Sequence, residues 1–235
     1  MDLELVLEII LSLVAVFMAI VLHEIAHGYV AFRLGDPTAR NRGRLTLNPL
    51  AHVDPIGTIV VPVFLALMRL LLRSSVPLLG WAKPVPINPT YFRNPLRGMV
   101  YVAVAGPGTN LVLAAATAGL GRLIVLAIPN QVVYGIGGFA THLIEAVFYL
   151  LSAFVLYNLI LAVFNLIPIP PLDGSRILLY FLPAEGRRFL LSIERYGFLV
   201  VLLILYLGLL DPLFQGVWRL WQLLVGSRWL ILLST

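Results

Sequence analysis

The chain has 235 residues, of which 60% are hydrophobic and 11% are charged, and its mean hydropathy is +0.99. Soluble domains carry about 25% charged residues, so this composition predicts an integral membrane protein without a separate soluble domain. The net charge of +5 is spread over short loops between apolar runs, which argues against a nucleic-acid binder. The absence of cysteine excludes disulfides and thiolate metal ligands.

The first predicted span, about 3–32, carries the sequence His-Glu-Ile-Ala-His at residues 23–27. On a helix, His23 and His27 lie one above the other and can bind one Zn²⁺ at ~2.0–2.1 Å. Glu24 projects ~100° round the helix, where it can act on a metal-bound water. The alternative is two satisfied histidines inside a helix bundle. Three ionisable residues in a membrane helix are costly, however, and usually mark function.

The elements that follow alternate between turn-rich stretches and apolar runs. Residues 45–57 combine an alternating pattern with prolines and a glycine, which predicts an extended hairpin or loop. The apolar run 56–72 is short, and we favour a re-entrant hairpin there because a full crossing would reverse the later spans. A second turn-rich stretch occupies 74–97. The remaining spans are expected at about 98–128, 137–167, 196–210 and 213–233.

Together these elements predict an all-α integral membrane protein with about five to six transmembrane helices. Re-entrant or extended membrane-associated loops are expected at 45–57 and 84–90, next to the metal site. We expect residues 1–235 to form a single polytopic domain, with a catalytic core of about 9–180 and C-terminal helices at about 196–233.

The distribution of positive charge predicts the orientation in the membrane. Residues 33–55, 73–97 and 176–195 each hold four Lys or Arg, whereas 1–8 and 129–137 hold none. The positive-inside rule then places the three positive loops in the cytoplasm and the N-terminus outside. The metal site would lie ~15 Å from the cytoplasmic surface and open to it through a polar channel. The expected location is a prokaryotic cell (inner) membrane.

A catalytic zinc takes three protein ligands, so one more is needed. The acidic and imidazole candidates are Asp36, His52, Asp54, His142, Glu145 and Asp173. His142 and Glu145 begin the 137–167 span, at the membrane face opposite the metal site. Asp173 lies on the correct side, in a Pro-Pro-Leu-Asp-Gly turn that can present a carboxylate to the metal. His52 is the runner-up, although a loop histidine bonded to backbone is the favoured interpretation of it.

At this point a family resemblance is clear. The sequence resembles the site-2 protease family of intramembrane zinc metalloproteases in three segments: His-Glu-Ile-Ala-His-Gly at 23–28, Ala-Gly-Pro-Gly-Thr-Asn at 105–110, and Asn-Leu-Ile-Pro-Ile-Pro-Pro-Leu-Asp-Gly at 165–174. The resemblance implies that His23, His27 and Asp173 bind one zinc ion and that Glu24 is the catalytic base. It also implies that 45–57 and 84–90 hold the substrate strand. We expect a compact member of that family, without a PDZ or CBS module.

The resulting functional prediction is an intramembrane zinc metalloendopeptidase. It would hydrolyse peptide bonds within or near transmembrane segments of membrane proteins, by Glu-assisted attack of a zinc-bound water. Its partners would be a membrane-protein substrate and the lipid bilayer, with no nucleic acid; the sequence does not predict the oligomeric state. The alternatives are a metal transporter and a catalytically inactive scaffold that binds membrane segments.

Four further residues are candidates for contacts with the substrate or the oxyanion. Asn110 and Asn165 could orient substrate carbonyls or stabilise the oxyanion, or else form hydrogen bonds between helices. The two interpretations are balanced for Asn165, and the structural one is favoured for Asn110. Asn48 and His52 are the remaining two candidates, both in the 45–57 stretch.

Overall fold

The computed structural model describes residues 3–72, 80–128 and 139–233, and every regular element in those ranges is a helix. The long helices are α1 (Leu3–Arg33), α4 (Pro95–Ala127) and α6 (Phe139–Asn165). The shorter helices are α2 (Thr38–Asn41), α3 (Val61–Leu72), α7 (Asp173–Phe181), α8 (Ala184–Ile193), α9 (Gly197–Tyr206), α10 (Asp211–Val225) and α11 (Ser227–Leu232). The expected turn residues 74–79 and the expected loop 129–137 lie outside the described residues.

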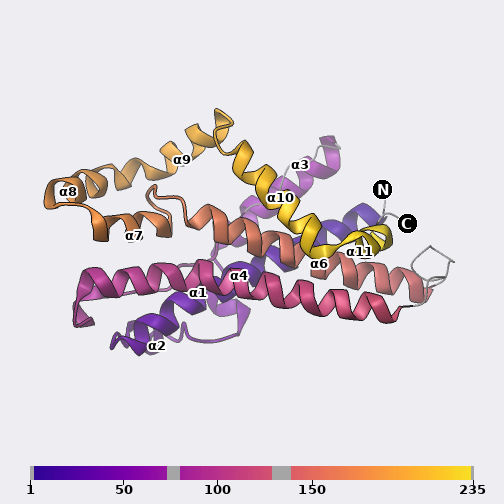
Figure 1. Cartoon of the computed structure of the whole chain (residues 1–235), viewed down its shortest axis with the longest axis horizontal. Coiled ribbons are helices and arrows are strands. Elements are labelled where there is room, and N and C mark those ends of the chain that lie inside the picture. The colour runs from indigo at the N-terminus through magenta and orange to yellow at the C-terminus, as the bar shows by residue number, and fades with distance from the viewer. Residues whose placement is uncertain (1–2, 73–79, 129–138, 234–235) are drawn as a thin grey trace.

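Helices α1, α4 and α6 pack together lengthwise and form the centre of the molecule (Figure 1). Four helices in the described ranges are long and apolar enough to cross a membrane. Three of them lie in α1, α4 and α6 (Glu4–Arg33, Pro95–Ala127 and Thr141–Asn165), and the fourth runs through α8 and α9 (Ala184–Tyr206). This confirms the prediction of an all-α integral membrane protein. The predicted number of five to six spans is not reached, since four helices in the described ranges qualify by length and hydropathy.

The C-terminal region explains part of this difference. The expected single span at 213–233 is wrong, because Gly226 has φ +82° and separates α10 from α11. A positive φ is a backbone conformation that glycine adopts readily and that ends a helix. The expected span at 196–210 is also too short by itself, because α9 ends at Tyr206 and only the combined run Ala184–Tyr206 is long enough.

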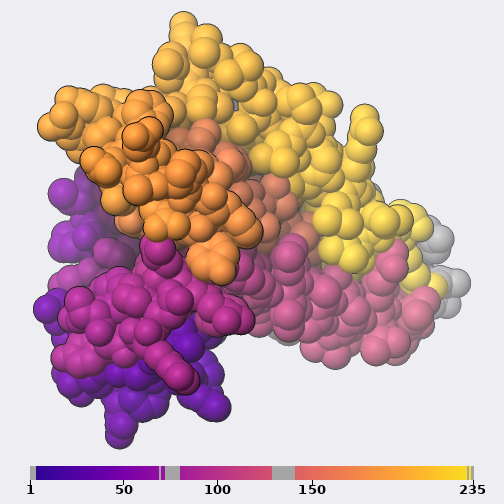
Figure 2. All heavy atoms as spheres, turned by 60° about the vertical axis from the view of Figure 1, so that its left-hand side comes forward, coloured from indigo at the N-terminus to yellow at the C-terminus, as the bar shows by residue number. Residues whose placement is uncertain are grey.

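Helices α10 and α11 are each bonded to α6 by a tryptophan side chain. Trp221 Nε1 donates to the carbonyl of Ser152 at 3.1 Å, and Trp229 Nε1 donates to the carbonyl of Phe148 at 3.1 Å. Both indole rings are buried, so their N–H groups need these partners. Figure 2 shows the C-terminal helices covering one side of the molecule, with the N-terminal half on the other side. The main apolar core lies between α4, α6, α10 and α11.

The stretch 45–57, predicted as an extended hairpin or loop, contains no strand, and only residues 45–48 and 53–54 are non-helical. It contains a 3-10 helix, η1 (Pro49–His52), and the start of a π-helix, η2 (Pro55–Val60), which continues into α3. The reason is local: each short helix begins with a proline, and the residue before it caps the first turn. Asn48 accepts from the N–H of Leu50, and Asp54 accepts from the N–H groups that follow Pro55. By contrast, residues 80–88 have no helical structure before the 3-10 helix η3 (Pro89–Tyr91).

Candidate metal centre

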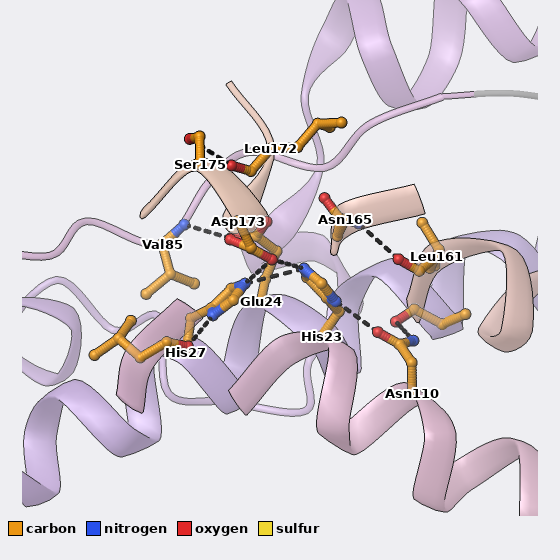
Figure 3. Close-up of polar contacts among 12 residues, drawn as sticks. His23, Glu24, His27, Val85, Asn110, Leu161, Asn165, Leu172, Asp173 and Ser175 are labelled. Atoms are coloured by element: carbon orange, nitrogen blue, oxygen red, sulfur yellow. Dashed lines mark hydrogen bonds and ion pairs between the residues drawn. The ribbon is translucent and has the colours of Figure 1, made fainter. Parts of the chain in front are cut away.

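Two buried histidines on α1 form the basis of the site. His23 and His27 are each 5% exposed, and their Nε2 atoms lie 2.9 Å apart. Figure 3 shows the two rings side by side, both facing the start of α7. The four-residue spacing on a helix brings the rings together on one face, as the motif predicts.

Asp173, the first residue of α7, supplies the third side chain. Its Oδ2 atom lies 3.2 Å from the Nε2 atom of His23 and 3.2 Å from that of His27. One ligand atom from each of the three residues lies within 4.8 Å of the others, and this is the group of potential metal ligands found in the described ranges. The structure therefore brings together the three residues that the family resemblance implies.

Hydrogen bonds at the far side of each ring orient the two histidines. His23 Nδ1 lies 2.5 Å from Asn110 Oδ1, and His27 Nδ1 lies 2.7 Å from the carbonyl oxygen of Val102. Both partners are acceptors on α4, so each Nδ1 carries the proton and donates it. In a neutral histidine the Nε2 atom is then an unprotonated acceptor that faces the centre of the site.

This donor set fits a metal ion. Two unprotonated nitrogens and a carboxylate oxygen converge with their lone pairs toward one point. Such electron-rich atoms repel one another unless a cation lies between them. Asp173 Oδ2 is buried and has no hydrogen-bond donor in the described chain. Ligand atoms bonded to a tetrahedral zinc at ~2.0–2.1 Å lie roughly 3.3 Å apart. The observed separations of 2.9–3.2 Å are close to that spacing.

Asn158 on α6 completes the orientation of His23, and sequence reasoning missed it. Asn110 Nδ2 donates to Asn158 Oδ1 at 2.7 Å, and Asn158 Nδ2 donates to the carbonyl of Phe154 at 2.8 Å. This chain fixes the amide of Asn110 with its oxygen toward His23. Both asparagines are fully buried. The available signal was a polar residue in the middle of an apolar span, which is costly unless it is bonded.

Close approach of α4 and of the Asp173 turn depends on two glycines. A Cβ on Gly106 would lie 2.5 Å from His23 Cε1 and 2.5 Å from His27 Nε2, so only glycine lets α4 reach the histidine pair. Gly108, two residues further on, has open space around it. Gly174 lies against the carbonyls of Leu166 and Ile167, which brings the Asp173 turn onto the end of α6.

Glu24 lies beside this group, and its carboxylate is half-buried and bonded to backbone (Figure 3). Its Oε2 atom accepts a hydrogen bond from the N–H of Val85 at 2.9 Å. Val85 belongs to the non-helical segment Gly80–Asn88, which we call the strap. The strap is thus the element that contacts Glu24 from outside α1.

The four further candidates occupy other positions. Asn165 donates to the carbonyl of Leu161 in its own helix, at 3.0 Å. Asn110 bonds His23, as described above. Asn48 caps η1 and is exposed, and His52 is buried with its Nε2 3.0 Å from the carbonyl of Thr46. His52 is not part of the potential metal-ligand group.

The remaining acidic and imidazole candidates also lie outside the group. Asp36 accepts hydrogen bonds from Thr38 and from the N–H of Asn88, and Asp54 caps η2. His142 and Glu145 bond each other at 3.2 Å near the start of α6.

Comparison with known proteins supplies independent information. The sequence model of peptidase family M50 matches residues 68–209. YwhC of Bacillus subtilis is 36% identical over 215 residues, which cover 92% of this chain and 86% of that protein. Rip2 of Mycolicibacterium smegmatis is 32% identical over 197 residues, and Rip2 of Mycobacterium tuberculosis H37Rv is 34% identical over 198 residues; each match covers 83% of this chain and 66% of the relative.

All three relatives carry the name "putative zinc metalloprotease". The family model begins after the His-Glu-x-x-His motif, but the match to YwhC takes in 215 of the 235 residues and therefore includes both this motif and Asp173. No solved structure gave a significant match.

Proposed function

The chain belongs to peptidase family M50 and is a zinc metalloprotease, and from this premise we propose that it hydrolyses peptide bonds within or near transmembrane segments of membrane proteins. The observation that carries the proposal is the position of the metal-ligand group. His23 and His27 lie within the candidate span Glu4–Arg33 and are bonded to residues of a second candidate span, Pro95–Ala127. A site between two such helices meets substrates that are themselves in the membrane.

His23, His27 and Asp173 would hold one zinc ion through Nε2, Nε2 and Oδ2. When bound, zinc polarises the substrate carbonyl and makes water a nucleophile near neutral pH. Glu24 is a carboxylate that lies beside the group and is not among its three residues (Figure 3). It would accept the proton of the attacking water and deliver it to the leaving amide nitrogen. Asn110 and Val102 keep the two imidazoles in the tautomer that leaves Nε2 free.

The substrate must reach this site as an extended strand, because the carbonyls of a helix are already hydrogen-bonded. We assign its docking edge to the strap, since the strap is itself extended. The strap also lies against Glu24, because the N–H of Val85 donates to Oε2 of that side chain. If the substrate pairs with the strap as a strand, a proline scan of the substrate, which removes one N–H at a time, should abolish cleavage at alternate positions.

The orientation follows from charge. The N-terminus is assigned to the outside of a prokaryotic cell (inner) membrane, and the metal centre opens toward the cytoplasm, because positive residues follow α1 and lie within and just after α7 and α8. The chain has no cysteine, so a single introduced cysteine is a clean probe of sidedness. Arg42→Cys should react with a membrane-impermeant thiol reagent only from the cytoplasmic side. Reaction from the outside alone would reverse the orientation.

The function is tested by reconstituting the purified chain in vesicles with a protein that has one transmembrane segment. Mass spectrometry of the products then gives the position of the cut. We expect zinc-dependent cleavage within or next to the transmembrane segment. Zinc binding without cleavage of any such substrate would favour the scaffold, and zinc movement across the vesicle membrane would favour the transporter.

A further inference from the structure

The strap is attached to the body of the protein at regular intervals along one edge. The N–H groups of Trp81, Lys83 and Val85 all donate hydrogen bonds to residues outside the strap, at 3.1, 2.8 and 2.9 Å. The first two bond backbone carbonyls, but the third bonds the side chain of Glu24. This two-residue period is that of an extended chain. The N–H of Asn88 then donates to buried Asp36 at 2.6 Å and fixes the far end of the strap.

The sequence around Val85 allows one donor at this point. Val85 lies between Pro84 and Pro86, and neither proline has an N–H. The two prolines also restrict the backbone to extended conformations. Pro-Val-Pro therefore presents a single N–H group in a stiff segment, and that group is the one directed at Oε2 of Glu24.

The side chain of Val85 rests on the same helix face that carries Glu24. Gly28 is four residues after Glu24, so the two positions lie one above the other on α1. A Cβ on Gly28 would lie 2.7 Å from Val85 Cγ1 and 2.8 Å from Leu45 Cδ2. Val85 is buried there, so its side chain and its N–H contact α1 at adjacent turns.

We propose that Val85 is a positioning residue for the catalytic base: its side chain seats on Gly28, and its N–H holds one oxygen of the Glu24 carboxylate. The proposal rests on the proposed role of Glu24. A glutamate side chain has several rotatable bonds, and a bond to Oε2 selects one conformation. The second oxygen, Oε1, is then presented for proton transfer. Because Gly28 and the N–H of Val85 would position Glu24 and not a zinc ligand, we expect zinc binding to be independent of them.

The first test removes the N–H without removing the segment. In Val85→Pro the strap stays extended but loses its bond to Glu24. We expect kcat to fall about tenfold or more, but by less than the ~10²–10⁴-fold contribution of the general base itself. Zinc content and KM should stay near wild-type values. The matched control is Lys83→Pro, which removes the neighbouring N–H that bonds the carbonyl of His52. An unchanged kcat in Val85→Pro, or an equal loss in the control, would overturn the proposal.

The second test uses size complementation. Gly28→Ala should push Val85 away from α1 and lower kcat at full zinc content. Adding Val85→Ala and Leu45→Ala removes both side-chain atoms nearest the new methyl group and keeps the N–H of Val85, so the triple variant should recover kcat relative to Gly28→Ala with Leu45→Ala alone. Absence of recovery in a zinc-loaded triple variant would count against the contact between Val85 and Gly28. Glu24→Gln distinguishes failure of the proposed base from failure of the positioning role. An active Glu24→Gln would mean that Glu24 is not the base. An inert Glu24→Gln together with a fully active Val85→Pro would refute only the positioning role of Val85.

Discussion

The two ends of the helix pair α4 and α6 differ in how their side chains are used. At the end near the metal centre, Asn110 of α4 bonds His23 and is itself bonded to Asn158 of α6. Gly106 of α4 leaves the space that the two histidines occupy. At the far end the same two helices contribute an apolar core that includes Ala118, Val125 and Phe148. One pair of helices thus combines a polar site with an apolar support.

The far end is closed by the C-terminal helices. Gly121 lies directly against the ring of Trp229, and the Phe148 ring meets that indole edge-on at 5.1 Å. Substitutions at this end should change stability and leave zinc affinity unchanged, while substitutions at the metal end should do the reverse. We expect this separation because the residues of α4 and α6 that orient the histidines differ from those that form the apolar core.

The largest loss of zinc affinity is expected for Asp173→Ala. Loss of a direct ligand should weaken zinc binding more than the 10–100-fold typical of outer hydrogen-bonding partners, and cleavage should be lost with it. Zinc content is measured by elemental analysis after equilibration with a chelator. Asp211→Ala is the matched control, because Asp211 is likewise the first residue of a helix, α10. Equal zinc affinity in the two variants would contradict the ligand assignment.

A smaller loss of zinc affinity is expected for Gly106→Ala. The added methyl group would occupy space next to His27 Nε2 and separate α4 from the histidine pair. Gly108→Ala carries the same substitution in the same motif where the space is open, so it should keep its zinc. The two variants are compared by zinc titration. If both retain wild-type affinity, the close approach of α4 is not needed for the site.

Asn110→Ala should weaken zinc binding by about 10–100-fold, since it removes the acceptor that orients His23. Asn158→Leu acts one step further away and should have a smaller effect in the same direction. Competition with a fluorescent zinc chelator gives both affinities. A larger effect for Asn158 than for Asn110 would mean that the hydrogen-bond chain does not run from α6 to His23.

The smallest effect on zinc binding is expected at the far end. Gly121→Ala should lower the free energy of unfolding by about 1–3 kcal/mol, as overpacking does, because the new methyl group meets the Trp229 ring. Gly119→Ala is the control, since the space around Gly119 is open. Thermal unfolding in detergent compares them, and zinc content should be unchanged in both. Loss of zinc in Gly121→Ala would show that the two ends are not independent.

Sequence reasoning predicted the metal end better than the rest. His23, Glu24 and His27 follow from helical spacing within one segment, and the approach of Asp173 was suggested by its turn and by family resemblance. Asn158 was not predicted as a neighbour of the site, and Val85 was expected there only as part of the stretch 84–90, without its bond to Glu24. Their partners are 48 and 61 residues away in the chain, and such contacts depend on tertiary packing rather than on a local pattern.

The errors of prediction have local physical causes. The alternation in 45–57 suggested extended structure, but proline at the first position of each turn and a capping side chain before it favour short helices. The 213–233 run was predicted as one span, although Gly226 breaks it. In both cases one or two turn-forming residues determined the local backbone conformation, whereas the hydrophobic pattern over the whole run did not predict it.

The central claim is that Glu24 is the base beside a zinc held by His23, His27 and Asp173. It is tested most directly by measuring zinc stoichiometry and substrate cleavage on the same preparations of wild type and Glu24→Gln. We predict one zinc per chain in both, cleavage by the wild type, and no cleavage by the variant. Cleavage by a zinc-loaded Glu24→Gln at the wild-type rate, or loss of zinc from it, would contradict this account.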